Sequence, residues 1–211
     1  MSQEEAKARR HRRRVRAIRS FFVRLFSLAL VLYILLGHIV GLLIMPNGDM
    51  YPRMDAGDLI LFYRIDRNPK AQDVIVMEKA VNPDHSALTV SGDRPEPGII
   101  RKAITFLGFR DPDAPETQTF VCRVVGAPGD TVEVSEEKGL VVNGNALMEP
   151  QIFYRTKPYE GFMQYPVTLG ADEYFVMADF RNGGADSRFF GPVSEDEIKG
   201  IVITILRRNN L

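Results

Sequence analysis

The chain has one cysteine and only three histidines, and these scarcities exclude several kinds of chemistry. The single cysteine, Cys122, excludes a disulfide within the chain. No cysteine or histidine cluster has metal-ligand spacing, so we expect no metal site and no cofactor. The histidines His11, His38 and His85 stand far apart, and a Ser-His-Asp triad would have to use His85. Nothing around that residue supports such a triad.

Charge is unevenly distributed, although the formal net charge is zero. Among the first twenty residues, only Glu4 and Glu5 are acidic, and eight are basic: Lys7, Arg9, Arg10, Arg12, Arg13, Arg14, Arg16 and Arg19. The part from Pro46 onward is therefore acidic, and the two parts are expected to do different jobs. A basic run can bind nucleic acid. Its position against an apolar segment favours a role in membrane topology instead, so no nucleic-acid partner is expected.

Residues 21–45 form an apolar run that carries no formal charge from Leu25 onward. About twenty apolar residues suffice for a helix that crosses a bilayer. We therefore predict a transmembrane helix at 21–45, a basic cytoplasmic tail at 1–20 and an extracellular domain at 46–211, since basic residues flank the cytoplasmic end. A cleaved signal peptide is the alternative, but the apolar core is too long and no small-residue cleavage site follows it. An exported domain without disulfides suits a Gram-positive envelope.

The part after residue 45 reads as short strands separated by turns. The expected strands lie at residues 58–63, 73–77, 122–125, 131–134, 140–142, 174–177 and 200–206. Asn143-Gly144 is a strong signal for a two-residue hairpin turn. Long periodic helices are absent from this part. The predicted fold class is mainly β: an N-terminal transmembrane helix followed by an all-β domain of packed, partly barrel-like sheets.

Residues 78–118 interrupt this pattern with a polar segment that is rich in proline at both ends. Its centre, Ile99 to Phe109, is apolar and basic. One interpretation is a tolerated surface insertion. The other is a flap that docks a partner, because a long loop with its own apolar centre is often functional.

Three segments carry recognisable motifs in a fixed order. Residues 46–54 read PNGDMYPRM, residues 120–132 read FVCRVVGAPGDTV, and residues 178–191 read ADFRNGGADSRFFG. They resemble the boxes P-S-G-S-M-x-P-T-L, K-R-x-V-G-x-P-G-D and G-D-N-R-x-x-S-x-D-S-R-x-x-G of type I signal peptidases, the S26 family. These are membrane-anchored serine proteases that use a Ser/Lys dyad. The resemblance spans most of residues 46–211 and implies the signal-peptidase fold for the domain.

The resemblance places altered residues at every polar position of the dyad site. The nucleophilic serine falls on Asp49 and the lysine base on Cys122. The serine that hydrogen-bonds the lysine falls on Gly184. The serine that donates to the oxyanion falls on Asn47, and an asparagine amide can also donate there. Because the dyad needs a hydroxyl beside a neutral lysine, no residue is expected to be catalytic by this mechanism.

Two other reaction mechanisms would reuse the altered residues. Cys122 would be a new nucleophile only beside a base or a cation, and the adjacent Arg123 points to the opposite face of a strand. A buried, inert cysteine is the preferred interpretation. Asp49 would need a second carboxylate within reach to act as an aspartic protease does. Asp179 and Asp186 are the candidates for this second carboxylate, but the resembled family offers no precedent for such a pair.

The remaining positions of the motifs are assigned structural or binding roles. Asp179, Arg181, Asp186 and Arg188 are interpreted as a buried or half-buried cluster of ion pairs behind the site. Met50, Tyr51 and Val121, with the neighbouring Phe120, are expected to line an apolar substrate groove that holds an extended chain. Pro128-Gly129-Asp130 reads as a turn.

Three hypotheses for function follow. The first is a non-catalytic, membrane-anchored assembly or chaperone-like factor, similar to the inactive signal-peptidase-like proteins of Gram-positive pilus assembly. Its partners would be the lipid bilayer, exported proteins such as pilins or preproteins, and sortase or other pilus machinery. The second is an active type I signal peptidase that cleaves preproteins. The third is a regulator that competes for preproteins with an active paralogue.

Overall fold

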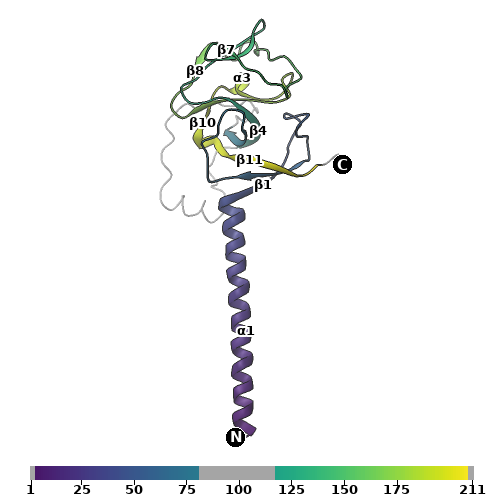
Figure 1. The fold of residues 1–211 in the computed structure, drawn as a ribbon, viewed down its shortest axis with the longest axis vertical. Coiled ribbons are helices and arrows are strands. Elements are labelled where there is room, and N and C mark those ends of the chain that lie inside the picture. The colour runs from purple at the N-terminus through teal and green to yellow at the C-terminus, as the bar shows by residue number, and fades with distance from the viewer. Residues whose placement is uncertain (1–2, 81–116, 209–211) are drawn as a thin grey trace.

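The structure is a computed structural model that describes residues 3–80 and 117–208. A long helix projects from a β domain, and β1 continues directly from the end of this helix (Figure 1). The elements in chain order are α1 (Gln3–Ile34), η1 (Leu35–Ile39), β1 (Val40–Ile44), β2 (Leu59–Tyr63), β3 (Val74–Ala80), β4 (Thr117–Gly126), β5 (Thr131–Ser135), β6 (Gly139–Val142), β7 (Asn145–Ala146), β8 (Val167–Thr168), β9 (Glu173–Met177), α3 (Ser187–Phe190), β10 (Val193–Ser194), η2 (Glu195–Glu197) and β11 (Ile198–Arg207).

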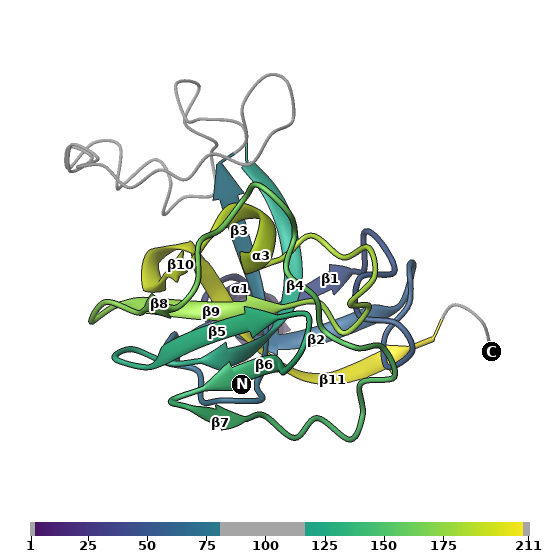
Figure 2. The same ribbon diagram turned by 90° about the horizontal axis from the view of Figure 1, so that it is seen from above.

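The strands form two sheets, which confirms the prediction of a mainly β domain. The larger sheet has the order β1-β2-β11-β3-β4-β9-β10, and the smaller has the order β7-β6-β5-β8. The smaller sheet lies beside β9 when the molecule is viewed from above (Figure 2). Side chains alternate between the two faces of a strand, so the side chains of β9 pack into two different apolar clusters. Its Phe175 and Met177 belong to the apolar cluster of the smaller sheet, whereas Tyr174 and Val176 belong to the cluster that contains Cys122.

Each strand expected from the sequence is present. The hairpin predicted at Asn143-Gly144 joins β6 to β7, and Val142 pairs with Asn145 across it. Asn143 and Gly144 have φ angles of 51° and 77°, the left-handed values that a two-residue hairpin requires. The turn at Pro128-Gly129-Asp130 is also confirmed, since the Asp130 amide donates to the Ala127 carbonyl at 3.0 Å.

The N-terminal helix differs from the prediction at both ends. It extends from Gln3 through the π-helical turn η1, and it ends at Ile39, six residues before the predicted limit of Met45. Residues Val40–Ile44 form β1 instead, in an antiparallel ladder with β2. Apolar residues fit a helix or a strand equally well, so pairing with β2 decides their conformation. Gly41 allows this pairing, because a Cβ atom there would lie 2.1 Å from the ring of Phe62.

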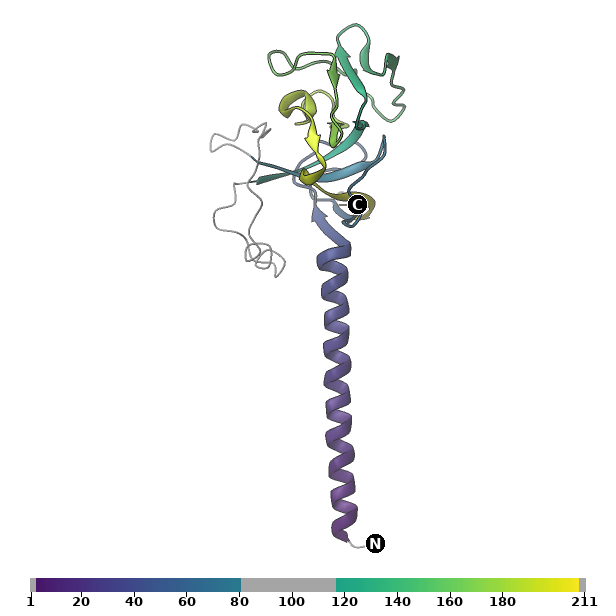
Figure 3. The same ribbon diagram turned by 90° about the vertical axis from the view of Figure 1, so that its left-hand side faces the viewer.

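Within the described residues, one helix is long and apolar enough to cross a membrane. It spans Arg14–Ile39, and none of its apolar window is buried against the domain. A side view shows that the helix runs clear of both sheets (Figure 3). The segment predicted as an insertion, 78–118, lies outside the described residues except for its two ends in β3 and β4.

Candidate functional site

The loop that carries Asp49 connects β1 to β2 and is held by short backbone hydrogen bonds. The Tyr51 amide donates to the Gly48 carbonyl at 3.0 Å, and the Met54 amide donates to the Met50 carbonyl at 3.0 Å. A longer-range bond joins this loop to the third motif, because the Phe180 amide donates to the Asp49 carbonyl at 2.8 Å. The first and third motifs therefore meet although they lie far apart in the sequence.

Asp49 and Cys122 converge on Ala185. The Cys122 thiol donates to the Ala185 carbonyl at 3.6 Å, and the Asp49 carboxylate accepts a hydrogen bond from the Ala185 amide. The charge of Asp49 also acts on the thiol. The fold thus brings together the two positions that the motifs assign to the nucleophile and the base.

The Asn47 side chain is hydrogen-bonded to Asp49 and does not stand free to donate to an oxyanion. Its Nδ2 donates to Asp49 Oδ2 at 2.8 Å, and its Oδ1 accepts from the Asp49 amide at 3.3 Å. The side chain is therefore used on both its donor and its acceptor side. In this structure, Asn47 therefore holds the carboxylate and the backbone amide of Asp49 in place.

Gly184 leaves no room for a side chain. A Cβ atom on Gly184 would lie 2.2 Å from the Cβ atom of Ala178 and 3.0 Å from the carbonyl oxygen of Phe180. The resembled motif has glycine at position 178 and serine at position 184, and here the larger residue of this pair stands at 178. The methyl group of Ala178 occupies the space that a serine at position 184 would need.

The predicted cluster of charges is buried, but its partners differ from those expected. Asp179, Arg181, Asp186 and Arg188 are each at most 2% exposed. Only Asp186 and Arg188 pair with each other, with Arg188 Nη2 lying 2.7 Å from Asp186 Oδ2 and Nε lying 2.9 Å from Oδ1. Arg181 pairs instead with Glu149 and donates to Thr156.

Asp179 pairs with Arg123, a residue that sequence reasoning placed only beside Cys122. Arg123 Nη2 lies 2.6 Å from Asp179 Oδ2, and Nε lies 2.8 Å from Oδ1. Alternation along β4 sends Arg123 away from the face of Cys122, so the structure agrees with the prediction that this arginine does not activate the thiol.

Tyr159 is a further residue of the site that the sequence did not reveal. Its hydroxyl donates to the Gly184 carbonyl at 2.9 Å and accepts from Arg188 Nη2 at 3.1 Å. Its ring lies 4.1 Å from the Arg188 guanidinium carbon. Tyr159 therefore links the buried ion pair to the backbone beside Ala185. No motif covers residues 142–167, so only proximity in the fold identifies it.

The residues expected to line a substrate groove are mostly core residues. Met50 is 0% and Val121 is 2% exposed, and both pack in the apolar cluster between β2 and β3. Phe120 is 4% exposed and lies against Phe190, with ring centroids 5.3 Å apart. Only Tyr51, at 49%, offers substantial surface. A buried side chain cannot contact a peptide, so Met50, Val121 and Phe120 offer no surface to one in this structure.

A different feature beside the site can accept an extended chain. Residues Thr117–Cys122 of β4 pair with β3 on one side, whereas β9 pairs with β4 only at Arg123–Gly126. In the described part of the chain, the second edge of Thr117–Cys122 has no strand partner. Only Thr117–Thr119 are exposed or partly exposed there, because Phe120, Val121 and Cys122 are at most 4% exposed. A hollow of about 270 Å³ also reaches Ala185, and Tyr159, Gly184 and Phe189 are among its walls.

The described residues contain no group of three or more histidine, cysteine or acidic side chains that could hold a metal ion.

Cys122 should be unreactive in the folded chain. Its thiol is 0% exposed, and burial, together with the charges of Asp186, Asp49 and Asp179, raises its pKa well above its ordinary value. Because the thiolate is the reactive form, 5,5′-dithiobis(2-nitrobenzoate) should label no thiol at neutral pH in the native chain and one per chain in guanidinium. Rapid labelling of the native chain would show that Cys122 is accessible.

Asp49→Asn should stabilise the chain at neutral pH. Burial raises the pKa of Asp49 more than the hydrogen bonds from Asn47 and Ala185 lower it. When folding raises the pKa of a carboxyl group, stability falls as the pH rises from the ordinary value, about 4, through the folded value. The uncharged amide of Asn at position 49 does not titrate, so the variant does not lose stability in this way. Urea unfolding of both chains at about pH 4 and about pH 7 should therefore show a difference that grows with pH. A difference that is independent of pH would contradict the prediction.

The comparisons with known proteins agree with the motifs. The family model described as "Signal peptidase, peptidase S26" matches residues 18–206. The chain therefore belongs to this family. It is 29% identical over 203 residues to signal peptidase I of Mycobacterium tuberculosis, an alignment that covers 88% of this chain and 68% of the relative. It is 28% identical over 209 residues to signal peptidase I of Pseudomonas aeruginosa, which covers 87% of this chain and 66% of the relative.

A solved structure is also similar. Signal peptidase I from Enterococcus faecalis V583 is 21% identical, with a TM-score of 0.38, and the match covers 64% of this chain and 97% of that chain.

Proposed function

We propose that this chain is a signal-peptidase homologue that binds exported polypeptides without cleaving them by the Ser/Lys mechanism. One observation supports the proposal: Asp49 and the buried Cys122, which the motifs align with the nucleophile and the base, both form hydrogen bonds with Ala185. The Asp49 carboxylate, which accepts a hydrogen bond from Asn47, cannot replace the serine hydroxyl that forms an acyl-enzyme. The buried Cys122 thiol has a raised pKa, so it stays protonated near neutral pH and cannot act as the base.

Binding is supported by the edge of β4 next to the site. An extended chain could add as a strand to the exposed part of this edge, Thr117–Thr119, with main-chain hydrogen bonds giving affinity. The hollow beside Ala185 would take a side chain of this segment. Exported segments such as preproteins or pilins are therefore the proposed partners. A role in pilus assembly, alongside sortase or related machinery, follows from the resemblance to inactive signal-peptidase-like proteins.

The test uses the full chain in lipid nanodiscs with a preprotein and a pilin as separate probes. We expect binding by at least one probe, and mass spectrometry should detect no cleavage of either. Asp49→Arg places a long cation at the site and should abolish the binding. Asp196→Arg makes the same charge change in the exposed turn η2 and serves as the matched control, with circular dichroism as the check on folding.

Two outcomes would oppose the proposal. Specific cleavage after a small-x-small site would show an active signal peptidase. Binding that survives Asp49→Arg would place the partner elsewhere on the protein, with the segment 78–118 as the next region to delete.

The proposed location is the cell membrane, with a single pass, the N-terminus in the cytoplasm and the domain outside. The basic tail before the apolar helix supports this orientation. Protease added to intact cells should digest the domain and spare an N-terminal epitope tag. Loss of the tag with an intact domain would reverse the topology.

A further inference from the structure

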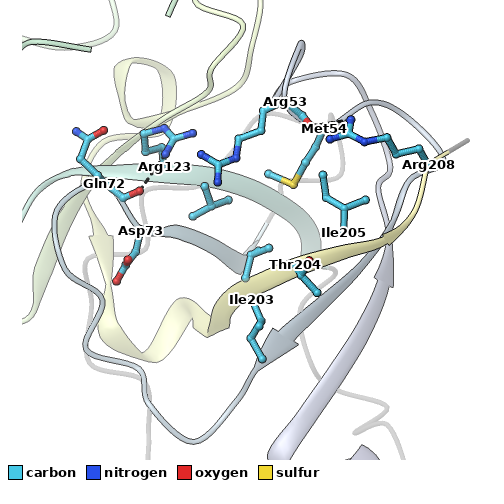
Figure 4. Close-up of a pocket in the computed structure, with 11 residues that line it drawn as sticks. Arg53, Met54, Gln72, Asp73, Arg123, Ile203, Thr204, Ile205 and Arg208 are labelled. Atoms are coloured by element: carbon cyan, nitrogen blue, oxygen red, sulfur yellow. Dashed lines mark hydrogen bonds between the residues drawn. The ribbon is translucent and has the colours of Figure 1, made fainter. Parts of the chain in front are cut away.

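A second hollow, of about 400 Å³, has neither Asp49 nor Cys122 among its lining residues. The C-terminal half of β11 forms one wall, and the loop at Arg53 and Met54 and the turn at Gln72 and Asp73 form the others (Figure 4). Its volume falls in the range of small-ligand sites, roughly 300–1,000 Å³. The hollow is therefore large enough for a short peptide segment, and of the charged site residues described above it includes only Arg123.

The wall formed by β11 is the edge of a strand. Residues 202–205 line the hollow consecutively. β3 pairs with β11 only at Ile198–Ile201, whereas β2 takes the other side from Ile201 to Arg207. Within the described part of the chain, the second edge of residues 202–207 has no strand partner. Such an edge is a template for an added strand.

Two arginines, Arg53 and Arg208, lie beside this edge. Arg53 and Arg208 are exposed, and among the described residues neither forms an ion pair with a carboxylate. Arg208 Nη1 donates to the Arg53 carbonyl at 3.1 Å, which places its guanidinium above the 53–54 loop. The Arg53 side chain extends across the hollow toward Arg123 (Figure 4).

The other charged groups of the hollow do not neutralise these two arginines. Arg123 is already paired with Asp179. The Asp73 carboxylate accepts from the Lys70 amide at 2.8 Å and points away from Arg53 (Figure 4). Two guanidinium groups therefore remain for an incoming anion, and guanidinium groups bind carboxylates in a bidentate manner.

We propose that this hollow is a second peptide-binding site, which adds an extended segment to β11 and holds a carboxylate of that segment on Arg53 and Arg208. The strand edge supplies the main-chain hydrogen bonds, and the two arginines select an acidic ligand. Two register shifts in β11, between Val202 and Thr204 and between Ile205 and Arg207, bend this edge, as bulges do beside binding sites. Both a chain terminus and a glutamate side chain supply such a carboxylate, and the test separates these two sources.

The experiment measures fluorescence anisotropy with the full chain in lipid nanodiscs. The probes are fluorescein-labelled Ser-Thr-Val-Thr-Val with a C-terminal carboxylate, the same peptide as an amide, and the amide extended by one glutamate. The test variant is Arg53→Gln with Arg208→Gln. The matched control is Arg207→Gln, which removes the same charge from an adjacent exposed residue that does not line the hollow. Hydrogen exchange then reports the amides of residues 202–207.

We expect the terminal carboxylate, the glutamate or both to confer binding, and the double variant to weaken it about tenfold or more, as the loss of charge-assisted hydrogen bonds does. Arg207→Gln should bind as the parent does, and amides of β11 should exchange more slowly in the complex. The proposal fails if no probe binds, if the uncharged amide binds equally well, if Arg207→Gln weakens binding as much as the double variant, or if exchange in β11 is unchanged.

Discussion

Asp49→Ser alone is expected to give no detectable cleavage of a preprotein. The new hydroxyl would have no base, because Cys122 is buried and its pKa is raised well above its ordinary value. Catalytic groups of this kind act as a unit, so a single repair recovers little. The measurement is mass spectrometry of a preprotein after incubation with the full chain in lipid nanodiscs. Turnover by the single variant would reveal a base that the structure does not show.

Restoring the motif residues at the three positions 49, 122 and 184 is also expected to fail. A serine at position 184 would place its Cβ atom 2.2 Å from that of Ala178, so the third motif would have to shift. Adding Ala178→Gly removes the obstructing methyl group. The quadruple variant Asp49→Ser, Cys122→Lys, Gly184→Ser and Ala178→Gly should therefore be the first to cleave. Equal activity of the triple and quadruple variants would show that Ala178 is not the obstacle.

Asp186→Ala is expected to cause the largest loss of stability. The Asp186 carboxylate is 0% exposed and accepts from the Ala178 amide at 3.0 Å, from the Arg188 amide at 3.0 Å and from the Arg188 guanidinium at 2.7 and 2.9 Å. Its removal leaves a buried cation without a counter-charge, which costs about 3–5 kcal/mol. The midpoint of thermal unfolding of the full chain should fall by more than about 6 °C.

Glu136→Ala provides the control for this prediction. Glu136 forms a surface ion pair with Lys157 at 3.6 Å, with side chains 71% and 59% exposed. Exposed pairs contribute about 0–1 kcal/mol, so the unfolding midpoint should barely change. Similar losses for Asp186→Ala and Glu136→Ala would mean that the buried pair does not support the fold.

The local pattern of the sequence predicted much of this molecule. Each expected strand is present, and the hairpin lies at Asn143-Gly144, because β-branched runs and left-handed turn residues constrain the backbone within a few residues. The apolar helix was also foreseen from its length and composition. The motifs identified Asp49 and Cys122 as a pair before any geometry was known, and the fold brings both to Ala185.

Contacts between distant segments decided the rest. Pairing with β2 turns Val40–Ile44 into a strand, although the same residues would suit a membrane helix. Arg123 pairs with Asp179 because β4 and β9 lie side by side in the sheet. Met50 and Val121 are buried because they pack in an apolar cluster with residues of β2 and β3. The obstruction of position 184 depends on how closely Ala178 approaches it, since a Cβ atom on Gly184 would lie only 2.2 Å from the Cβ atom of Ala178. Sequence periodicity reports which way a side chain points along its own element, whereas its partner is set by which elements the tertiary fold places together.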